Sequence, residues 1–215
     1  MKAISQGSLH RVFHGPMSVT LAVLFAATLL SNAQTNSAPE SRRPCCEQIN
    51  SSNPLSDRSV YQLSSHWTTD ARKTMRLGQL RGKPQVVVMF YSLCQYACPL
   101  LVHEVQQLAE SLPANTRTNV GFLLVTFDSE HDTPDVLHAY RLTRKLPSDQ
   151  WTLLHGRPED VRELALVLGI KYRQEARGQF SHSNVITILN AEGEISFQQT
   201  GLANSPAELA KHLPR

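Results

Sequence analysis

The chain has 215 residues, 41% of them hydrophobic, and carries 21 Lys and Arg against 18 Asp and Glu, for a formal net charge of +3. This near-neutral balance argues against a protein that coats nucleic acid, because such domains are usually strongly basic. The composition, with 12 Pro and 10 Gly, is that of neither a disordered tail nor a fibre, and the length predicts one domain with room for a tail.

Residues 1–33 have the layout of a secretory signal peptide. Lys2 and Arg11 make the start basic, no acidic residue occurs in the segment, and a largely apolar core at 17–30 is followed by small residues up to Ala33. This core is shorter than the ~20 residues of a membrane helix. We therefore expect cleavage after Ala33 and export, to the bacterial periplasm, with an uncleaved membrane anchor as the alternative.

Two further segments follow the signal. Residues 34–58 are rich in Asn, Ser, Pro and Gln without apolar periodicity, which predicts a flexible lead-in. Residues 59–215 then form the expected globular domain.

The domain alternates between strand and helix patterns. The run QVVVMFY at 85–91 is continuously apolar and rich in β-branched residues, which is typical of a strand buried on both faces. Further along the chain we expect a helix with Leu101, Val105, Leu108 and Leu112 on one face, a strand at 120–127, a helix at 134–145, a strand at 151–154, a helix at 158–168, a hairpin of strands 185–189 and 194–199, and a last helix opening at Ser205-Pro206. This order predicts an α/β, thioredoxin-like fold: a central mixed sheet flanked by helices, with a C-terminal β-hairpin and helix.

Proline marks the expected start of four helices. The steps are Cys98-Pro99, Thr133-Pro134, Arg157-Pro158 and Ser205-Pro206. Proline suits the first helical position because its missing N–H would have no partner there. We accordingly expect Cys98 to be the N-cap of its helix and Thr133 to cap the helix that follows it.

Cys94 and Cys98 form a local pair in the loop that leaves the first central strand. In an oxidising compartment such a pair is a disulfide or is kept reduced for a purpose. A structural disulfide is the plain alternative, but closing so short a loop removes little entropy from the unfolded chain. Both sulfurs should lie at the carboxyl edge of the sheet, where open α/β sheets bind ligands. The local pair therefore favours a chemical role for the two cysteines over a structural disulfide.

The spacing leaves two kinds of chemistry open. Thiol–disulfide oxidoreductases of this fold commonly use Cys-x-x-Cys, and the extra residue here leaves room for a metal between the sulfurs. Two thiolates suit copper(I), and an added imidazole would accommodate copper(II) as well. A thiol peroxidase, with Cys94 attacking peroxide and Cys98 resolving, fits less well because Tyr91 stands where such enzymes usually have Thr or Ser.

Three segments together resemble the Sco/SenC family. They are VMFYSLCQYACP at 88–99, VTFDSEHDTP at 125–134 and FSHS at 180–183. The resemblance implies a thioredoxin-like, copper-binding protein that acts in assembling the dinuclear copper centre of cytochrome c oxidase. It also implies that Cys94, Cys98 and His182 are the copper ligands and that Asp128 is a carboxylate near the metal.

Position alone also favours His182, since it lies on a loop just before the strand expected at 185–189. Asp128 ends a buried strand, where it could stabilise a cationic site or face solvent. His66, His103, His131, His138 and His155 have no comparable placement. We do not expect these five as ligands.

The chain departs from the family pattern at three positions. Gln95 stands where the family usually has Pro, His131 where it usually has Arg, and Ser181 where it often has Asp. These changes leave the expected copper ligands intact. They concern the identity of the partner protein to which copper would be delivered. The expected partner is a copper-receiving subunit of a respiratory oxidase or another copper carrier, with no nucleic acid, and with the membrane reached only through that partner or an uncleaved signal.

The alternative function is a thiol–disulfide oxidoreductase that keeps a partner's cysteines reduced. Both functions need Cys94 and Cys98, so the sequence does not separate them. Cys45 and Cys46 are adjacent in the lead-in, where a disulfide between neighbours would be strained, so we expect free thiols. They could pass copper onward, bridge to a partner or have no role.

Overall fold

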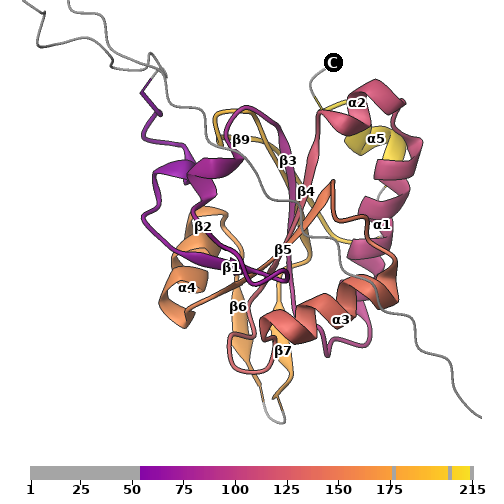
Figure 1. Ribbon diagram of the computed structural model, residues 1–215. Helices are drawn as coiled ribbons and strands as arrows, with labels where there is room; N and C mark the ends of the chain where they lie inside the picture. The colour runs from indigo at the N-terminus through magenta and orange to yellow at the C-terminus, as the bar shows by residue number, and fades with distance from the viewer. Residues whose placement is uncertain (1–53, 176–177, 203–204, 214–215) are drawn as a thin grey trace, which may run out of the picture. The chain divides into compact units, whose positions relative to one another are not determined.

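The computed structural model describes residues 54–175, 178–202 and 205–213 (Figure 1). The expected signal peptide at 1–33 and the Cys45-Cys46 pair lie outside these residues, as does all of the lead-in except its last five positions. Among those five, Ser56 donates a hydrogen bond to the Glu194 carboxylate. None of the helices in the described ranges has both the length and the apolar character needed to span a bilayer.

A seven-stranded mixed sheet forms the centre of the domain, with the strand order β2-β1-β5-β4-β3-β8-β9. The strands are β1 (Trp67–Thr69), β2 (Thr74–Met75), β3 (Gln85–Phe90), β4 (Gly121–Thr126), β5 (Trp151–Gly156), β8 (Val185–Leu189) and β9 (Ile195–Thr200). β3, β4 and β5 are parallel, while β1 and β8 pair antiparallel with β5 and β3. The expected mixed sheet and its C-terminal hairpin, β8–β9, are confirmed.

The two apolar runs recognised in the sequence lie in the middle of this sheet. Every residue of β3 is buried, as are the last five of β4. The strands pair in parallel from Gln85↔Gly121 to Phe90↔Thr126. Such continuous burial requires cover on both faces, since parallel strands are rarely left open to water. The loops that leave β3 and β4 therefore meet at one sheet edge.

Five α-helices and two 3-10 turns complete the described domain. They are α1 (Ala97–Ser111), α2 (Ala114–Thr118), α3 (Pro134–Arg144), α4 (Pro158–Val167), α5 (Pro206–Ala210), η1 (Val60–Gln62) and η2 (Leu77–Leu80). Figure 1 shows α1, α3 and α5 on one side of the sheet and α4 on the other. The predicted face of α1 is confirmed, because Leu101, Val105 and Leu108 are fully buried.

Three of the four proline steps open helices as predicted, at Pro134, Pro158 and Pro206. The expected N-cap at Cys98 is wrong, because α1 begins at Ala97 with Tyr96 as its N-cap. Cys98 is thus the second helical residue and Pro99 the third. The first four N–H groups of a helix have no partner within it, so proline is tolerated at the third position as well as the first. At Cys98, this tolerance of proline in the first turn outweighs the general bias of a residue before proline against helical backbone angles.

A separate two-stranded sheet, which we call the ribbon, was not predicted. It consists of β6 (Tyr172–Gln174) and β7 (Phe180–His182), paired antiparallel with His182 opposite Tyr172. His182 was expected on a loop, and it is instead the last residue of β7. Three-residue strands with mostly polar side chains have too little period-2 signal to be recognised.

A buried ion pair fixes α3 against the sheet. The guanidinium of Arg141 in α3 donates to both carboxylate oxygens of Asp70, one of them at 2.7 Å, and to the Trp151 carbonyl of β5 at 2.8 Å. The side chains of Arg141 and Asp70 are only 8% and 4% exposed. Burial by itself would raise the pKa of Asp70, but the hydrogen bonds and charge of Arg141 outweigh it and lower that pKa. The pair therefore remains charged inside the domain.

Candidate metal centre

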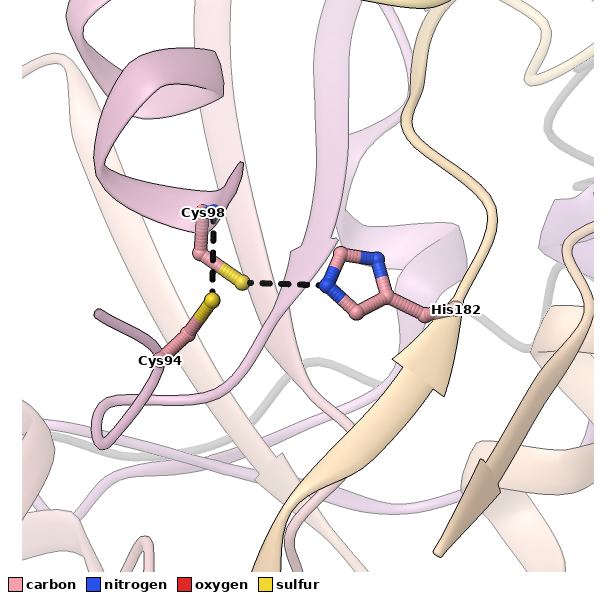
Figure 2. Close-up of side chains that lie close together, drawn as sticks. All are labelled: Cys94, Cys98 and His182. Atoms are coloured by element: carbon pink, nitrogen blue, oxygen red, sulfur yellow. Dashed lines mark hydrogen bonds between the residues drawn. The ribbon is translucent and has the colours of Figure 1, made fainter. Parts of the chain in front are cut away.

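Three side chains from two distant parts of the chain meet at the edge where β3 ends. Cys94 lies in the loop after β3, Cys98 in the first turn of α1, and His182 at the end of the ribbon (Figure 2). Their sulfur and ring nitrogen atoms all lie within 4.8 Å of one another. The structure therefore brings together the three residues that the sequence proposed as ligands.

The loop places the two sulfurs side by side without joining them. Both cysteines are free thiols, with Cys94 partly exposed and Cys98 buried. The Cys98 backbone N–H donates to Cys94 Sγ at 3.3 Å, and the Cys94 N–H donates to the Tyr91 carbonyl at 3.2 Å. These bonds close the loop and hold the Cys94 sulfur at the start of α1, beside that of Cys98 (Figure 2).

The two thiols differ in acidity. Hydrogen bonds from the Cys98 thiol and from the Cys98 and Tyr96 N–H groups outweigh desolvation and lower the pKa of Cys94 to about 4. The hydrogen bond to Cys94, together with burial, raises the pKa of Cys98. Cys94 is therefore the thiolate at neutral pH, and Cys98 holds the proton between the two sulfurs. A metal ion that bound both would displace that proton, since metal ligation requires deprotonated thiols.

His182 presents its Nε2 atom to the sulfurs. That atom lies 3.5 Å from Cys98 Sγ, and Nδ1 lies 3.2 Å from the Ser183 carbonyl oxygen. A proton on Nδ1, donated to this carbonyl, leaves the lone pair of Nε2 facing Cys98. A backbone acceptor on the second nitrogen is the usual way in which a metal-ligating histidine is oriented.

Aromatic rings form the wall behind the imidazole. The ring of Phe127 lies 5.1 Å from that of His182, and Tyr91 contacts it edge-on at 6.1 Å. Phe180 packs on both Tyr91 and Phe127 at 5.1 Å. The apolar wall limits water on one side of the site, which strengthens electrostatic interactions there.

The donor set fits a soft metal ion. Bonds of about 2.0 Å to nitrogen and about 2.3 Å to sulfur keep two ligands of one ion within about 4.6 Å of each other. The three atoms, within 4.8 Å of one another, need only a small adjustment to share an ion. Two thiolates and one imidazole suit copper in either oxidation state, and thiolates also bind zinc.

Asp128 has a different partner. Its side chain is 2% exposed, so it does not face solvent. It accepts hydrogen bonds from the His131 backbone N–H at 3.1 Å and from His131 Nδ1 at 2.9 Å. This contact raises the pKa of His131. The structure thus pairs Asp128 with His131 and does not include it in the three-residue cluster.

Asp132 has a role at the cysteine loop that the sequence did not reveal. Its buried carboxylate accepts from the Ser92 backbone N–H at 2.9 Å and from the hydroxyls of Ser92 and Thr126. Burial raises the pKa of Asp132 in spite of these bonds. The sequence indicated only helix capping here, and Thr133 does cap α3 by accepting from the Val136 N–H. Asp132 instead ties the start of the cysteine loop to the end of β4.

The five histidines that were not expected as ligands are not part of the cluster. Four of them have polar contacts elsewhere: His66 with Arg76, His131 with Asp128, His138 with Asp70 and His155 with the Asp132 carbonyl.

A family model described as SCO1/SenC matches residues 58–215. A protein of Stutzerimonas stutzeri described as "Putative copper-binding protein" is 27% identical over 120 residues, which cover 54% of this chain and 57% of that protein. The chain thus matches little more than half the length of this curated relative.

Solved structures share the fold at lower identity. Copper-bound ScoI of Arabidopsis thaliana has a TM-score of 0.61 at 18% identity, covering 68% of this chain and 91% of its own. A SCO1/SenC family lipoprotein of Bacillus anthracis has a TM-score of 0.62 at 20% identity, covering 68% and 88%. At these identities the likeness concerns the fold, and the expected thioredoxin-like fold is confirmed.

Proposed function

Because the chain belongs to the SCO1/SenC family, we propose that it binds copper through Cys94, Cys98 and His182 and acts as a copper chaperone. In this role it delivers copper to, or prepares, the copper centre of a cytochrome c oxidase. The observation that carries the proposal is the convergence of two thiols and one imidazole nitrogen within 4.8 Å.

The difference between the two sulfurs suits transfer of the ion. Cys94 is the more accessible ligand, and the pKa of about 4 makes it a thiolate that can take up copper without first losing a proton. An incoming ligand of a partner would approach from this side and replace Cys94 first. Cys98 and His182, held against the core and the aromatic wall, would keep the ion until further ligands of the partner replace them.

A protein partner has a surface to contact beside this thiolate. Leu93, Tyr96 and Leu100 are 55%, 82% and 51% exposed and lie in and next to the cysteine loop. Exposed apolar side chains gathered in one place are typical of protein–protein contact sites. The partner in this proposal is a copper-receiving oxidase subunit or another copper carrier.

The place of action in the proposal is the bacterial periplasm, reached through the expected signal peptide at 1–33. The domain organisation that goes with it is a lead-in at 34–58 and the copper-binding domain at 59–215. Because this compartment is oxidising, the two thiols must be kept reduced until copper is loaded.

Metal analysis of anaerobically purified protein tests the proposal. We expect one copper(I) per chain in the wild type and its loss in a Cys94→Ser, Cys98→Ser double variant. A His103→Ala variant is the matched control, because His103 is exposed on α1 and outside the cluster. A wild type that takes up no copper, or prefers zinc over copper(I), would contradict the proposal.

The second candidate is a thiol–disulfide oxidoreductase, favoured by the same asymmetry of the thiols. A partly exposed thiolate beside a buried thiol is the arrangement in which one sulfur attacks a partner disulfide and the other resolves the mixed disulfide. The reduction potential of the pair and its exchange with a model disulfide separate the candidates. A pair that cycles rapidly with substrates but leaves copper(I) unbound would favour the oxidoreductase.

A further inference from the structure

The ribbon that carries His182 is not part of the sheet that positions the cysteines. β6 and β7 form their own two-stranded sheet, apart from the seven-stranded one. His182 therefore approaches Cys98 on an element whose backbone pairing does not fix it to β3 or α1. The chain does join the ribbon to the sheet just beyond His182, because β8 begins at Val185 and pairs with β3. Side-chain contacts of the ribbon then set how closely the imidazole approaches the sulfurs.

Tyr91 contacts both halves of the site. Its backbone carbonyl accepts from the Cys94 N–H at 3.2 Å, which anchors the cysteine loop. Its hydroxyl donates to Gln179 Oε1 at 3.0 Å and accepts from the Phe180 N–H at 3.4 Å, which anchors the ribbon. The Tyr91 side chain is 3% exposed, so its ring is buried, whereas Gln179 is exposed and Phe180 half-buried. Phe180 is two residues from His182 on the same strand.

We propose that the Tyr91 hydroxyl is a positioning group that holds the ribbon, and with it His182, against the cysteine loop. The inference rests on the proposed function in taking His182 as a copper ligand. It assigns to Tyr91 no contact with the metal. The hydroxyl acts through the ribbon, in the way that outer groups around a metal site orient the ligands.

The consequence differs between the two copper oxidation states. Copper(I) is satisfied by the two thiolates, whereas copper(II) needs the additional nitrogen. Loss of the Tyr91 hydroxyl leaves both sulfurs in place and frees the imidazole of His182 to move. Copper(II) affinity should therefore fall while copper(I) affinity stays close to that of the wild type.

Two variants and a control test this. Tyr91→Phe removes the hydroxyl and keeps the ring, and Gln179→Leu removes the acceptor on the ribbon without altering the cysteine loop. The second variant is needed because Tyr91 also contacts the cysteine loop through the Cys94 N–H, so a change at Tyr91 alone could act on Cys94. Gln174→Leu is the control, since Gln174 is exposed on the opposite strand of the ribbon, facing Phe180.

Copper(II) affinity, thiolate-to-copper absorption and copper(I) affinity are measured on the full chain. We expect Tyr91→Phe and Gln179→Leu to lower copper(II) affinity by about 10- to 100-fold, the range for groups that orient a ligand, and to weaken the absorption. Gln174→Leu should change neither. Unchanged copper(II) affinity in both test variants would overturn the inference. So would a fall confined to Tyr91→Phe that is equal for both oxidation states, because the hydroxyl would then act on Cys94 directly.

A metal-free measurement separates this inference from the proposed function. The Phe180 amide donates to the Tyr91 hydroxyl, so its hydrogen exchange should accelerate in Tyr91→Phe and not in Gln174→Leu. If the wild type binds no copper, the proposed function fails, and the exchange rate still decides whether Tyr91 holds the ribbon. Unchanged hydrogen exchange of the Phe180 amide in Tyr91→Phe would overturn the inference that the Tyr91 hydroxyl holds the ribbon.

Discussion

Cys98 Sγ lies 3.5 Å from His182 Nε2, although the two residues are 84 positions apart in the sequence. The helix that carries Cys98 begins directly after the loop leaving β3, while His182 ends a strand of the ribbon. The thiol and the imidazole are thus supplied by separate elements of the domain. Each half of the site can be altered without removing the other.

Replacement of His182 by Ala should separate the two oxidation states of copper. We expect copper(I) to remain bound through Cys94 and Cys98, more weakly, and copper(II) to lose most of its affinity together with the thiolate-to-copper absorption. Absorption spectroscopy and competition titrations measure this. If oxidase maturation in cells fails with His182→Ala while dithiol exchange in vitro is normal, copper handling is the function. If maturation survives and only loss of a cysteine abolishes it, the oxidoreductase is favoured.

Alkylation should distinguish the two thiols. Because the pKa of Cys94 is lowered to about 4, its thiolate fraction is already complete near neutrality, and its reaction rate with iodoacetamide should be flat from about pH 6 to about pH 8. Cys98 is buried with a raised pKa and should stay unmodified. In Cys98→Ala the hydrogen bond from the Cys98 thiol is lost, so the Cys94 rate should fall at low pH. A wild-type rate that rises tenfold per pH unit toward pH 8 would contradict the assignment.

Asp132→Asn should change how stability depends on pH. Burial raises the pKa of Asp132 above its usual 3.8, so the folded protein binds this proton more tightly than the unfolded chain does. Stability contributed by the proton is present at low pH and is lost as pH rises through the folded pKa, by about 1.4 kcal/mol for each pH unit that separates the folded and unfolded pKa values. Urea denaturation from about pH 4 to about pH 7 should show the wild type losing stability relative to Asp132→Asn. A constant difference between the two would exclude this role for the carboxylate.

Removing one member of the Asp70–Arg141 pair should destabilise the domain strongly. Both side chains are at least nine-tenths buried, and Arg141→Met leaves the Asp70 carboxylate without its main partner. The expected loss in the free energy of unfolding is about 3–5 kcal/mol. The double variant Asp70→Leu, Arg141→Met should recover much of that loss, because no buried charge remains. Equal destabilisation by the single and double variants would show that packing, and not the uncompensated charge, dominates.

Signal cleavage predicts a defined mass. If residues 1–33 are a signal peptide, the protein recovered after cell fractionation should begin at Gln34 and appear in the periplasmic fraction. Intact-mass measurement checks this directly. Recovery with membranes, at a mass that retains the first 33 residues, would indicate an uncleaved anchor.

The elements with a strong local signal could be predicted from the sequence. β3 and β4 are continuous apolar runs. A proline marks the first residue of each of three helices, at Pro134, Pro158 and Pro206. β1 and β2 have only three and two residues, which is too short for a period to show. β1 is a strand because β5 offers it an edge, and β2 pairs in turn with β1. Those edges exist only in the folded domain.

At the site, the residues that form the cluster could be predicted from the sequence, whereas the residues that hold them in place could not. Two thiols close in sequence and one family-matched histidine indicated the cluster, and the three do converge. Asp132 and Tyr91 were missed because their roles depend on partners far along the chain, Ser92 for one and Gln179 for the other. Nothing in the local pattern distinguishes a carboxylate that caps a helix from one that reaches back to another loop.

The position of β8 beside β3 has a consequence for the order in which the chain folds. β8 pairs with β3 across about a hundred residues, from Gln85↔Leu189 to Val88↔Ile186. Contacts so distant form late, whereas a loop of a few residues closes in well under a microsecond. During folding we therefore expect the Cys94 and Cys98 thiols to meet each other before His182 arrives. In an oxidising compartment an electron acceptor can take the pair to a disulfide in that interval, and a thiol reductant must then act on the newly folded protein before copper can enter.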